Sequence, residues 1–446
     1  MTSHFHLFAS SAVGSGAEDL AKHLFLQIVV ILCATQVVVW ISRRFLGQTN
    51  VAGEILAGIV LGPSVLGALA PDVSKTIFHP STSSIFVGLA QLALVLLMFQ
   101  IGMEFEFGSS LVKSKKSVVA ISLTGILFPF ALGYFSAPWF HSSMAEPRPN
   151  LLGFRLFFAI AMSITAIPIL GRIFMELRLS RTRIAALTIG AAAVDDICGW
   201  LLLGVVSAIV TSNFSAKDVS LRLLMLAGFL AVVFGIVRKP LARFVVGKIR
   251  QHGEMRAEVL VVILLVLFLS ALATSYIGVF AIIGGFIVGV SLHQEREIVE
   301  EWKQRMSGLV NTLLLPLFFT YTGLRTDIGT LSTANAWLQC GLVCTIAFAG
   351  KLGGAYVAAR ACGEEHRHAL AIGVCMNTRA LMELIALNIG YDLGVLPRQM
   401  YTMLVIMALI STYMATPLIR WLMLKERAPD DLRAASTEPT SAPLAR

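Results

Sequence analysis

Long apolar stretches separated by short polar ones make up nearly the whole chain. A bilayer core requires about 20 consecutive apolar residues per helix, and stretches of about this length recur from residue 20 to residue 424. The pattern therefore predicts an all-α polytopic membrane protein with about thirteen transmembrane helices. The predicted segments lie at 20–42, 49–68, 84–104, 115–140, 153–176, 182–211, 219–247, 257–276, 278–293, 306–324, 334–360, 367–391 and 398–422.

Two polar segments flank the predicted membrane domain at 20–424. Residues 1–19 carry Glu18 and Asp19 before the first apolar stretch and lack the basic region and cleavage site of a secretory signal. We therefore expect the first stretch to remain as a helix. Residues 425–446 are polar and rich in Pro and Ala, which is typical of a disordered tail.

Composition and charge support the membrane class. The chain is 57% hydrophobic and 14% charged, whereas about a quarter of the residues in a soluble domain are charged. Lys and Arg concentrate in alternate loops, among them Arg43, Arg44, Lys248 and Arg250, which places those loops in the cytoplasm by the positive-inside rule. The net charge of +9 therefore reflects the arrangement of the loops across the membrane and does not indicate a nucleic-acid-binding surface. The distribution of Lys and Arg predicts an inner-membrane protein with its N-terminus outside and its C-terminus in the cytoplasm.

The cysteines and histidines give no sign of a cofactor site. The six cysteines lack paired spacing, so we read them as small buried residues. The pairs His4/His6 and His366/His368 lack the remaining ligands of a metal site. We therefore expect neither disulfides nor a resident cofactor.

Few charged residues fall within the predicted helices. An ionisable side chain inside a membrane is a functional candidate by default, because burying a charge is costly. Glu54 and Glu104 lie near the ends of their segments, where a long side chain reaches the interface. The residues that lie deeper are Asp195, Asp196, Lys351, Arg379 and Glu383.

The stretch AAAVDDICGWLLLG at 191–204 carries two adjacent aspartates. Successive helical residues point about 100° apart, so Asp195 and Asp196 serve different neighbours. Lys351 needs a carboxylate partner if it stays charged in the membrane, and glycines beside it permit close helix approach. A salt bridge that only joins two helices explains one aspartate. The other is then available to bind a cation or a proton.

Two predicted helices contain breaks, the first within AMSITAIPILGRIF at 161–174. Pro168 removes a backbone donor there and is expected to free carbonyl groups about one turn earlier, near Ile164 and Thr165. Freed carbonyls at membrane depth are tolerated only in buried or water-lined places, where they can coordinate a cation.

The second break lies within GVCMNTRALMELIALNIG at 373–390. The run Asn377-Thr378-Arg379 places three polar residues at membrane depth. Arg379 and Glu383 are four residues apart and therefore share a helix face, which favours pairing between them.

The two breaks occupy matching positions in two triplets of predicted helices. Each triplet has a broken middle helix, and seven helix starts separate the triplets, so the two run in opposite directions across the membrane. An ordinary kink explains either break alone. Paired breaks in inverted repeats are typical of secondary transporters, whose ion site lies where the broken helices cross. The triplets are 115–140, 153–176 and 182–211, and 334–360, 367–391 and 398–422.

Five stretches together carry a family resemblance: GEILAGIVLGPSVLG (53–67), SITAIPILGRI (163–173), AAAVDDICGWLLLG (191–204), LPLFFTYTGL (315–324) and MNTRALMELIALNIGYDLGVL (376–396). They closely resemble the monovalent cation/proton antiporter-2 family, the Kef-type and sodium/proton exchanger proteins. The resemblance implies an elevator-type antiporter that exchanges Na⁺ or K⁺ for protons across the cell membrane. The partners it implies are the cation, the proton, a second copy of the chain and the surrounding membrane lipid.

The resemblance also implies roles for the polar residues. Asp196 matches the family's ion- and proton-binding carboxylate, where Na⁺ or K⁺ would bind. Asp195 matches the preceding acid, which pairs with the lysine corresponding to Lys351. Thr165 matches a crossing-helix position that helps to coordinate the cation. The second crossing helix carries Asn377, Arg379 and Glu383.

Family architecture implies a core domain at about 115–211 and 334–422 and a dimer or scaffold domain at about 20–104 and 219–293. The chain departs from the Kef-type potassium exporters in two ways. Those proteins usually have Gln-Asp where this chain has Asp-Asp, and a large nucleotide-binding domain where this chain has a short tail. These departures disfavour nucleotide-gated potassium efflux.

Three other classes fit the sequence less well. An intramembrane aspartyl protease needs two aspartates that face each other from different helices, so we expect no enzyme activity. A channel would need a filter of backbone carbonyls, and Lys351 near the path would repel cations. A carrier of similar fold for an organic anion stays open, and solute uptake that persists without a pH gradient would identify it.

Overall fold

The computed structural model describes residues 3–46, 48, 50–103, 115–144, 148–165, 170, 173, 174, 179, 182–212, 216–278, 280–379 and 381–423. All secondary structure within these residues is helical, and they contain no strand. The all-α fold predicted from the hydrophobic pattern is therefore confirmed.

Long helices alternate with short connecting turns. The α-helices are α1 (Ser3–Leu46), α2 (Asn50–Leu61), α3 (Leu66–Leu69), α4 (Pro71–Ile77), α5 (Ser83–Met103), α6 (Lys115–Ser142), α7 (Leu151–Ser163), α9 (Arg183–Thr211), α10 (Ala216–Val232), α11 (Arg238–His252), α12 (Ala257–Ile277), α13 (Ala281–Leu292), α14 (Arg296–Trp302), α15 (Leu315–Arg325), α16 (Ala334–Ala361), α17 (His366–Met376), α18 (Leu381–Asp392) and α19 (Arg398–Met423). The π-helical turns are η3 (Val233–Val237), η4 (Lys303–Ser307) and η5 (Val310–Leu314), and the 3₁₀ turns are η1 (Pro80–Thr82) and η6 (Ile328–Thr330).

Side-chain caps define where three central helices begin. Asn150, Thr182 and Thr333 accept hydrogen bonds from backbone N–H groups in the first turns of α7, α9 and α16. These N–H groups have no acceptor inside the helix, so the caps satisfy donors that would otherwise be unpaired. The sequence thus sets the starts of α9, which carries Asp195 and Asp196, of α16, which carries Lys351, and of α7, which ends beside them.

The described residues contain nine helices that are long and apolar enough to cross a bilayer. Arg296–Ser307 and Val310–Thr330 meet at a bend of 48° and make a tenth span if the two together count as one. The remaining predicted segments correspond to shorter helices, namely α7, α13 and the pair α17 and α18. The number of thirteen spans therefore stays a prediction.

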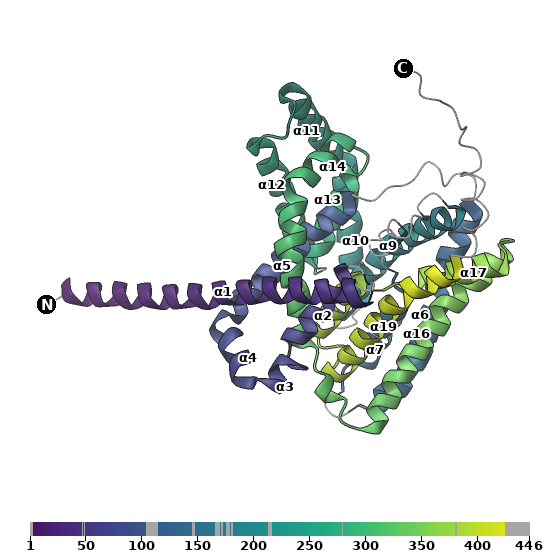
Figure 1. The fold of residues 1–446 in the computed structure, drawn as a ribbon. Helices are drawn as coiled ribbons and strands as arrows, with labels where there is room; N and C mark the ends of the chain where they lie inside the picture. The colour runs from purple at the N-terminus through teal and green to yellow at the C-terminus, as the bar shows by residue number, and fades with distance from the viewer. Residues whose placement is uncertain are drawn as a thin grey trace, which may run out of the picture.

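The helices pack into two groups (Figure 1). One group joins α6, α7, α9, α16, α17, α18 and α19, and the other joins α1, α2, α5 and α10 to α15. In Figure 1, α6, α16, α17 and α19 lie together at the lower right, and α11 to α14 lie in the upper part. Contacts of α9 with α10 and of α19 with α2 connect the two groups. Each half of the chain contributes helices to both groups.

A polar cluster also joins the groups. Arg325 at the end of α15 lies 2.6 Å from an Asp392 carboxylate oxygen of α18 and 3.1 Å from Asn388 Oδ1. Its guanidinium also lies 5.1 Å from the ring centroid of Tyr391, a cation–π contact. One arginine thus holds an end of the second group against the first.

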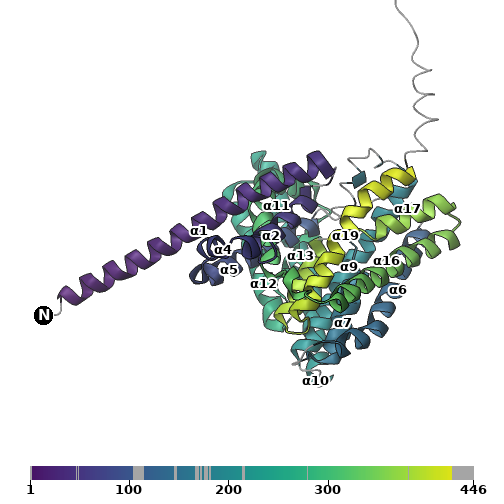
Figure 2. The same ribbon diagram turned by 60° about the horizontal axis from the view of Figure 1, so that its bottom comes forward.

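Helix α1 extends well away from the other helices toward the N-terminus (Figure 2). The hydrophobic pattern predicted a helix at 20–42, and the structure extends it to Ser3–Leu46. Phe25 and Trp40 are 64% and 62% exposed, as expected of side chains that face lipid. The apolar pattern marks the membrane part of a helix and not its ends.

Helix α5 packs directly on the backbone of α13. A Cβ atom added at Gly102 would lie 2.5 Å from the Phe286 carbonyl oxygen, and one added at Gly289 would lie 2.2 Å from that of Phe99. Small residues allow membrane helices to approach this closely. These glycines therefore set the distance between the two helices.

The same helix provides a matched test. Gly102→Ala should lower the thermal stability of the purified protein, since overpacking costs about 1–3 kcal/mol. Gly88→Ala should not, because a Cβ added at Gly88 would meet no atom of another element within 4 Å and Ala favours a helix. Melting curves in detergent measure both, and equal melting temperatures would contradict this account of the α5–α13 contact.

Candidate functional site

Lys351 of α16 lies inside the first helix group, and its ammonium has three acceptors. Nζ lies 2.7 Å from Asp195 Oδ2 and 2.8 Å from the Gly125 carbonyl oxygen, and it also donates to the Ser163 carbonyl. An ammonium has three N–H donors, so all three are used. The side chains of Lys351 and Asp195 are both 0% exposed. They form a buried, fully hydrogen-bonded ion pair.

A proline in α6 supplies one of these acceptors. Pro129 lies inside the helix and has no N–H, so the carbonyl four residues earlier, that of Gly125, lacks its helical donor. A Cβ at Gly125 would lie 4.0 Å from Lys351 Nζ, and one at Gly350 would lie 3.0 Å from Pro129 Cβ. Close packing of α6 on α16 thus brings the lysine to the freed carbonyl.

Asp195 of α9 accepts two further hydrogen bonds. Ser122 Oγ of α6 lies 2.6 Å from Oδ1, and Thr165 Oγ1, just after α7, lies 2.8 Å from Oδ2. Both carboxylate oxygens therefore have donors. The charge of Asp195 is neutralised within the protein by Lys351 and by these hydroxyl groups.

Asp196, the next residue of α9, has different surroundings. The residue is 1% exposed, and within the described residues neither of its carboxylate oxygens has a hydrogen-bond partner. Buried polar groups in proteins are nearly always paired, and an unpaired buried carboxylate is costly. The adjacent acids therefore differ: the protein neutralises Asp195, and the part of it that the structure describes offers Asp196 no donor.

The first broken segment ends against two basic side chains. Helix α7 stops at Ser163. Arg379 donates to the carbonyls of Ala161 and Met162, and Lys351 donates to the carbonyl of Ser163. The last carbonyls of a helix lack helical donors and form the negative end of its dipole. Two cations from the second half of the chain therefore cap this helix.

The carbonyls that receive the basic side chains lie just before those that the sequence indicated. The sequence placed them near Ile164 and Thr165 on the basis of Pro168, which lies outside the described residues. The backbone is already extended at Ile164, where ψ is 140°. The carbonyls that receive the basic side chains are those of residues 161–163, in the last turn of α7.

The second break touches the first. Helix α17 ends at Met376 and α18 begins at Leu381. The Thr165 hydroxyl, which also reaches Asp195, lies 3.1 Å from the Met376 carbonyl oxygen. The predicted crossing residue Thr165 therefore bridges the aspartate helix and the end of α17.

The other predicted residues of the second break lie beside this contact. Arg379 lies 3.4 Å from Glu383 Oε2, and both side chains are 0% exposed. Asn377 is 9% exposed, and among the described residues its Oδ1 has no hydrogen-bond partner. Thr412 of α19 donates to the Arg379 carbonyl. Arg379 thus joins α7, α18 and α19.

Two predicted candidates lie elsewhere, and several contributors were not predicted. Glu54 is half-buried in α2, and Glu104 lies outside the described residues. Ser122 had no distinguishing signal, since one serine in an apolar segment is common. Pro129 was such a signal, because a proline inside an apolar segment frees a carbonyl four residues earlier.

Fold and site together define an α-helical membrane protein with two interrupted helices that meet at a buried Asp-Asp and lysine cluster. Residues 28–425 match the family described as sodium/hydrogen exchanger, transmembrane. The chain belongs to this family, and the resemblance to monovalent cation/proton antiporters is confirmed.

Individual relatives agree with the family match. The chain is 37% identical over 395 residues to the Na(+)/H(+) antiporter NhaS4 of Synechocystis sp.. This match covers 88% of this chain and 95% of the relative. It is 35% identical over 403 residues to the cation/H(+) antiporter 17 of Arabidopsis thaliana, across 90% of this chain. The match covers 48% of that plant protein, so the chain spans about half its length.

A solved structure supports the fold. The sodium proton antiporter MjNhaP1 from Methanocaldococcus jannaschii, determined at pH 8, matches with a TM-score of 0.64 at 17% sequence identity. The match covers 90% of this chain and 99% of that chain. The helical fold over 90% of the chain is thus similar to that of this antiporter.

The ion pair makes a prediction about stability. Removing one partner of a buried pair typically costs about 3–5 kcal/mol, because the other charge stays buried. Lys351→Ala should therefore lower the melting temperature of the purified protein much more than Lys75→Ala, which changes an exposed lysine. Lys351→Ala combined with Asp195→Asn should recover part of the loss. Strict additivity of the two changes would argue against direct coupling.

Proposed function

We propose that this protein is a secondary active transporter that exchanges a monovalent cation, Na⁺ or K⁺, for protons, with Asp196 as the shared binding site. The observation that carries the proposal is the buried Asp196 carboxylate, which has no described hydrogen-bond partner. Family membership supports the same class of transport.

The charges at the crossing point support a single monovalent ligand. Lys351 pairs with Asp195, and Arg379 pairs with Glu383. Among the buried charges of the described crossing region this leaves one, the negative charge of Asp196. One monovalent cation or one proton restores neutrality, whereas an anion would increase the imbalance.

Competition for this carboxylate couples the two ions. Burial of a carboxylate without a partner favours its protonated form, so Asp196 holds a proton when no cation is bound. A cation that binds must displace this proton, and a returning proton must displace the cation. Only states in which the charge is neutralised can move across the bilayer at low cost.

Oxygen atoms around the two breaks are suitable for cation coordination. The Thr165 hydroxyl lies at the contact between the aspartate helix and α17. Asn377 Oδ1 is a further buried oxygen without a described donor. Hydroxyl, amide and carbonyl oxygens beside a carboxylate form the kind of site that broken helices build in secondary transporters. We assign these two side chains to the cation site with Asp196.

An elevator-type movement is consistent with how the helices are grouped. We propose that the group with α6, α7, α9 and α16 to α19 is the moving core and that the other group is the scaffold. Two copies of the scaffold would form a homodimer. The contact through Arg325 and Asp392 would then have to break during transport. The basic residues of alternate loops support an orientation with the N-terminus outside the inner membrane and the C-terminus in the cytoplasm.

Reporter fusions test the orientation. A fluorescent protein that folds only in the cytoplasm should be bright when it is fused after residue 446. Alkaline phosphatase, which needs the oxidising exterior, should be inactive at the same position. The reverse result would mean an even number of spans and would remove the inverted relation between the two triplets.

Transport in proteoliposomes tests Asp196. Asp196→Asn keeps the size of the side chain and removes its charge and titration, so it should abolish cation-dependent proton movement. Asp195→Asn should impair transport less, and Asp72→Asn, at an exposed aspartate of α4, is the neutral control. A pH-sensitive dye inside the vesicles reports exchange while Na⁺, K⁺ and Li⁺ are titrated separately.

The pH dependence follows from the same competition. Protons should inhibit exchange in acid, and the apparent affinity for the cation should increase as pH rises. An Asp196→Asn protein that is folded, reconstituted and still exchanges cations for protons would disprove the assignment. Uptake that is independent of the pH gradient would point to a different solute.

A further inference from the structure

A continuous helical run from Ala216 to His252 changes character halfway along its length. Its first part is apolar and faces outward, with Leu224 and Ile236 at 69% and 66% exposure. At 1.5 Å per residue, residues 219–237 span about 28 Å, close to the roughly 30 Å hydrocarbon core of a bilayer. The basic helix α11 therefore begins at a boundary between hydrocarbon and headgroups.

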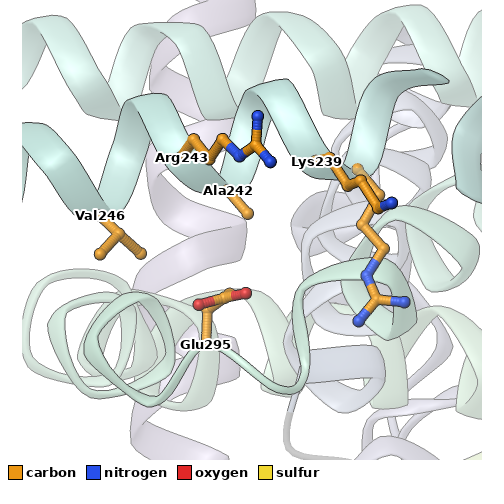
Figure 3. A pocket seen from close by; sticks show the side chains of 6 residues that line it. Lys239, Ala242, Arg243, Val246 and Glu295 are labelled. Atoms are coloured by element: carbon orange, nitrogen blue, oxygen red, sulfur yellow. The ribbon is translucent and has the colours of Figure 1, made fainter.

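A cavity of about 300 Å³ lies at this boundary. Figure 3 shows Lys239, Ala242, Arg243 and Val246 along one helix, with Glu295 across from them. Arg238 also lines the cavity. Glu295 belongs to the turn between α13 and α14, so the cavity lies between α11 and that turn.

The cavity has an excess of positive charge. Its three basic side chains face one carboxylate, that of Glu295. Within the described residues neither Lys239 nor Arg243 has an ion pair, and both are exposed. Arg250, further along α11, differs because it lies 2.7 Å from Glu297. Lys248 donates to Gln251, so Lys239 and Arg243, which line the cavity, are the lysine and arginine of α11 without a hydrogen bond or ion pair to the described residues.

We propose that this cavity binds the phosphate of an anionic phospholipid headgroup. An arginine guanidinium binds phosphate through paired N–H groups, and a lysine adds a point charge. Basic pockets at the ends of membrane helices bind acidic headgroups in this way. Ala242 and Val246 give the cavity an apolar wall that suits the glycerol part of a lipid.

The position of the cavity favours a lipid over free phosphate. The exposed apolar face of α10 and η3 extends to Ile236, two residues before Arg238, and Phe244 of α11 is itself 44% exposed. A lipid whose acyl chains lie along that face would have its headgroup at Arg238, Lys239 and Arg243. Binding would connect α11 with the α13–α14 turn. Arg238 already donates a hydrogen bond to Gln294 of this turn.

Native mass spectrometry and thermal melting of the purified full-length protein test the proposal. The probes are phosphatidylglycerol, phosphatidylcholine and inorganic phosphate, each added separately. Phosphatidylglycerol should bind and raise the melting temperature, and the other two should have little effect. Lys239→Gln combined with Arg243→Gln should weaken phosphatidylglycerol binding about 25-fold, since each surface charge contributes about 1 kcal/mol.

Two further variants make the result specific. Lys75→Gln with Lys217→Gln removes the same charge from exposed lysines outside the cavity and should leave binding unchanged. Glu295→Gln removes the opposing carboxylate and should strengthen binding about fivefold. Equal binding in the cavity variant and the control would overturn the site. Equal stabilisation by phosphatidylcholine, or by inorganic phosphate with no lipid retained, would overturn the lipid assignment.

Discussion

The ion pair between Lys351 and Asp195 is the interaction on which the rest of the site depends. A charged side chain at membrane depth must be neutralised or lose its charge, and Lys351 meets this requirement through contacts with three other helices. It reaches Asp195 of α9, the Gly125 carbonyl of α6 and the Ser163 carbonyl that ends α7. One ammonium thus fixes the aspartate helix, the proline-interrupted helix and the first broken segment together.

Arg379 has a parallel function at the same helix end. It donates to the Ala161 and Met162 carbonyls and lies beside Glu383. Both cations come from the second half of the chain, and both serve carbonyls of the first half. The dipole of α7 has its negative end at this point, so charge and hydrogen bonds join the two interrupted segments in addition to apolar packing. Broken helices are tolerated inside a bilayer where the freed groups are buried and paired, as the carbonyls of residues 161–163 are.

Much of this arrangement could be predicted from the sequence, because charge in a membrane is so restricted. Two acids and one lysine in apolar segments predicted a contact between Asp195 and Lys351, and Lys351 Nζ lies 2.7 Å from Asp195 Oδ2. The spacing of Arg379 and Glu383 pointed to their pairing in the same way. Ser122 and the Met376 carbonyl could not be predicted, since they depend on which helix faces meet. The hydrophobic pattern also located most spans, but it missed the true ends of α1 and the end of α7 at Ser163.

The adjacency of the two aspartates has a physical consequence of its own. Within the described residues, Lys351 pairs with Asp195 and makes no hydrogen bond with the adjacent Asp196. If Asp195 were absent, the lysine would be drawn to Asp196 and would occupy the place of a transported ion. Asp195 prevents this because it holds the ammonium 2.7 Å from Oδ2, with Ser122 and Thr165 fixing the carboxylate. Because successive side chains diverge by about 100° on a helix, the second acid points away from the pair and makes no hydrogen bond with the lysine. Asp195 thus keeps the protein's own cation away from the carboxylate that we assign to the cargo.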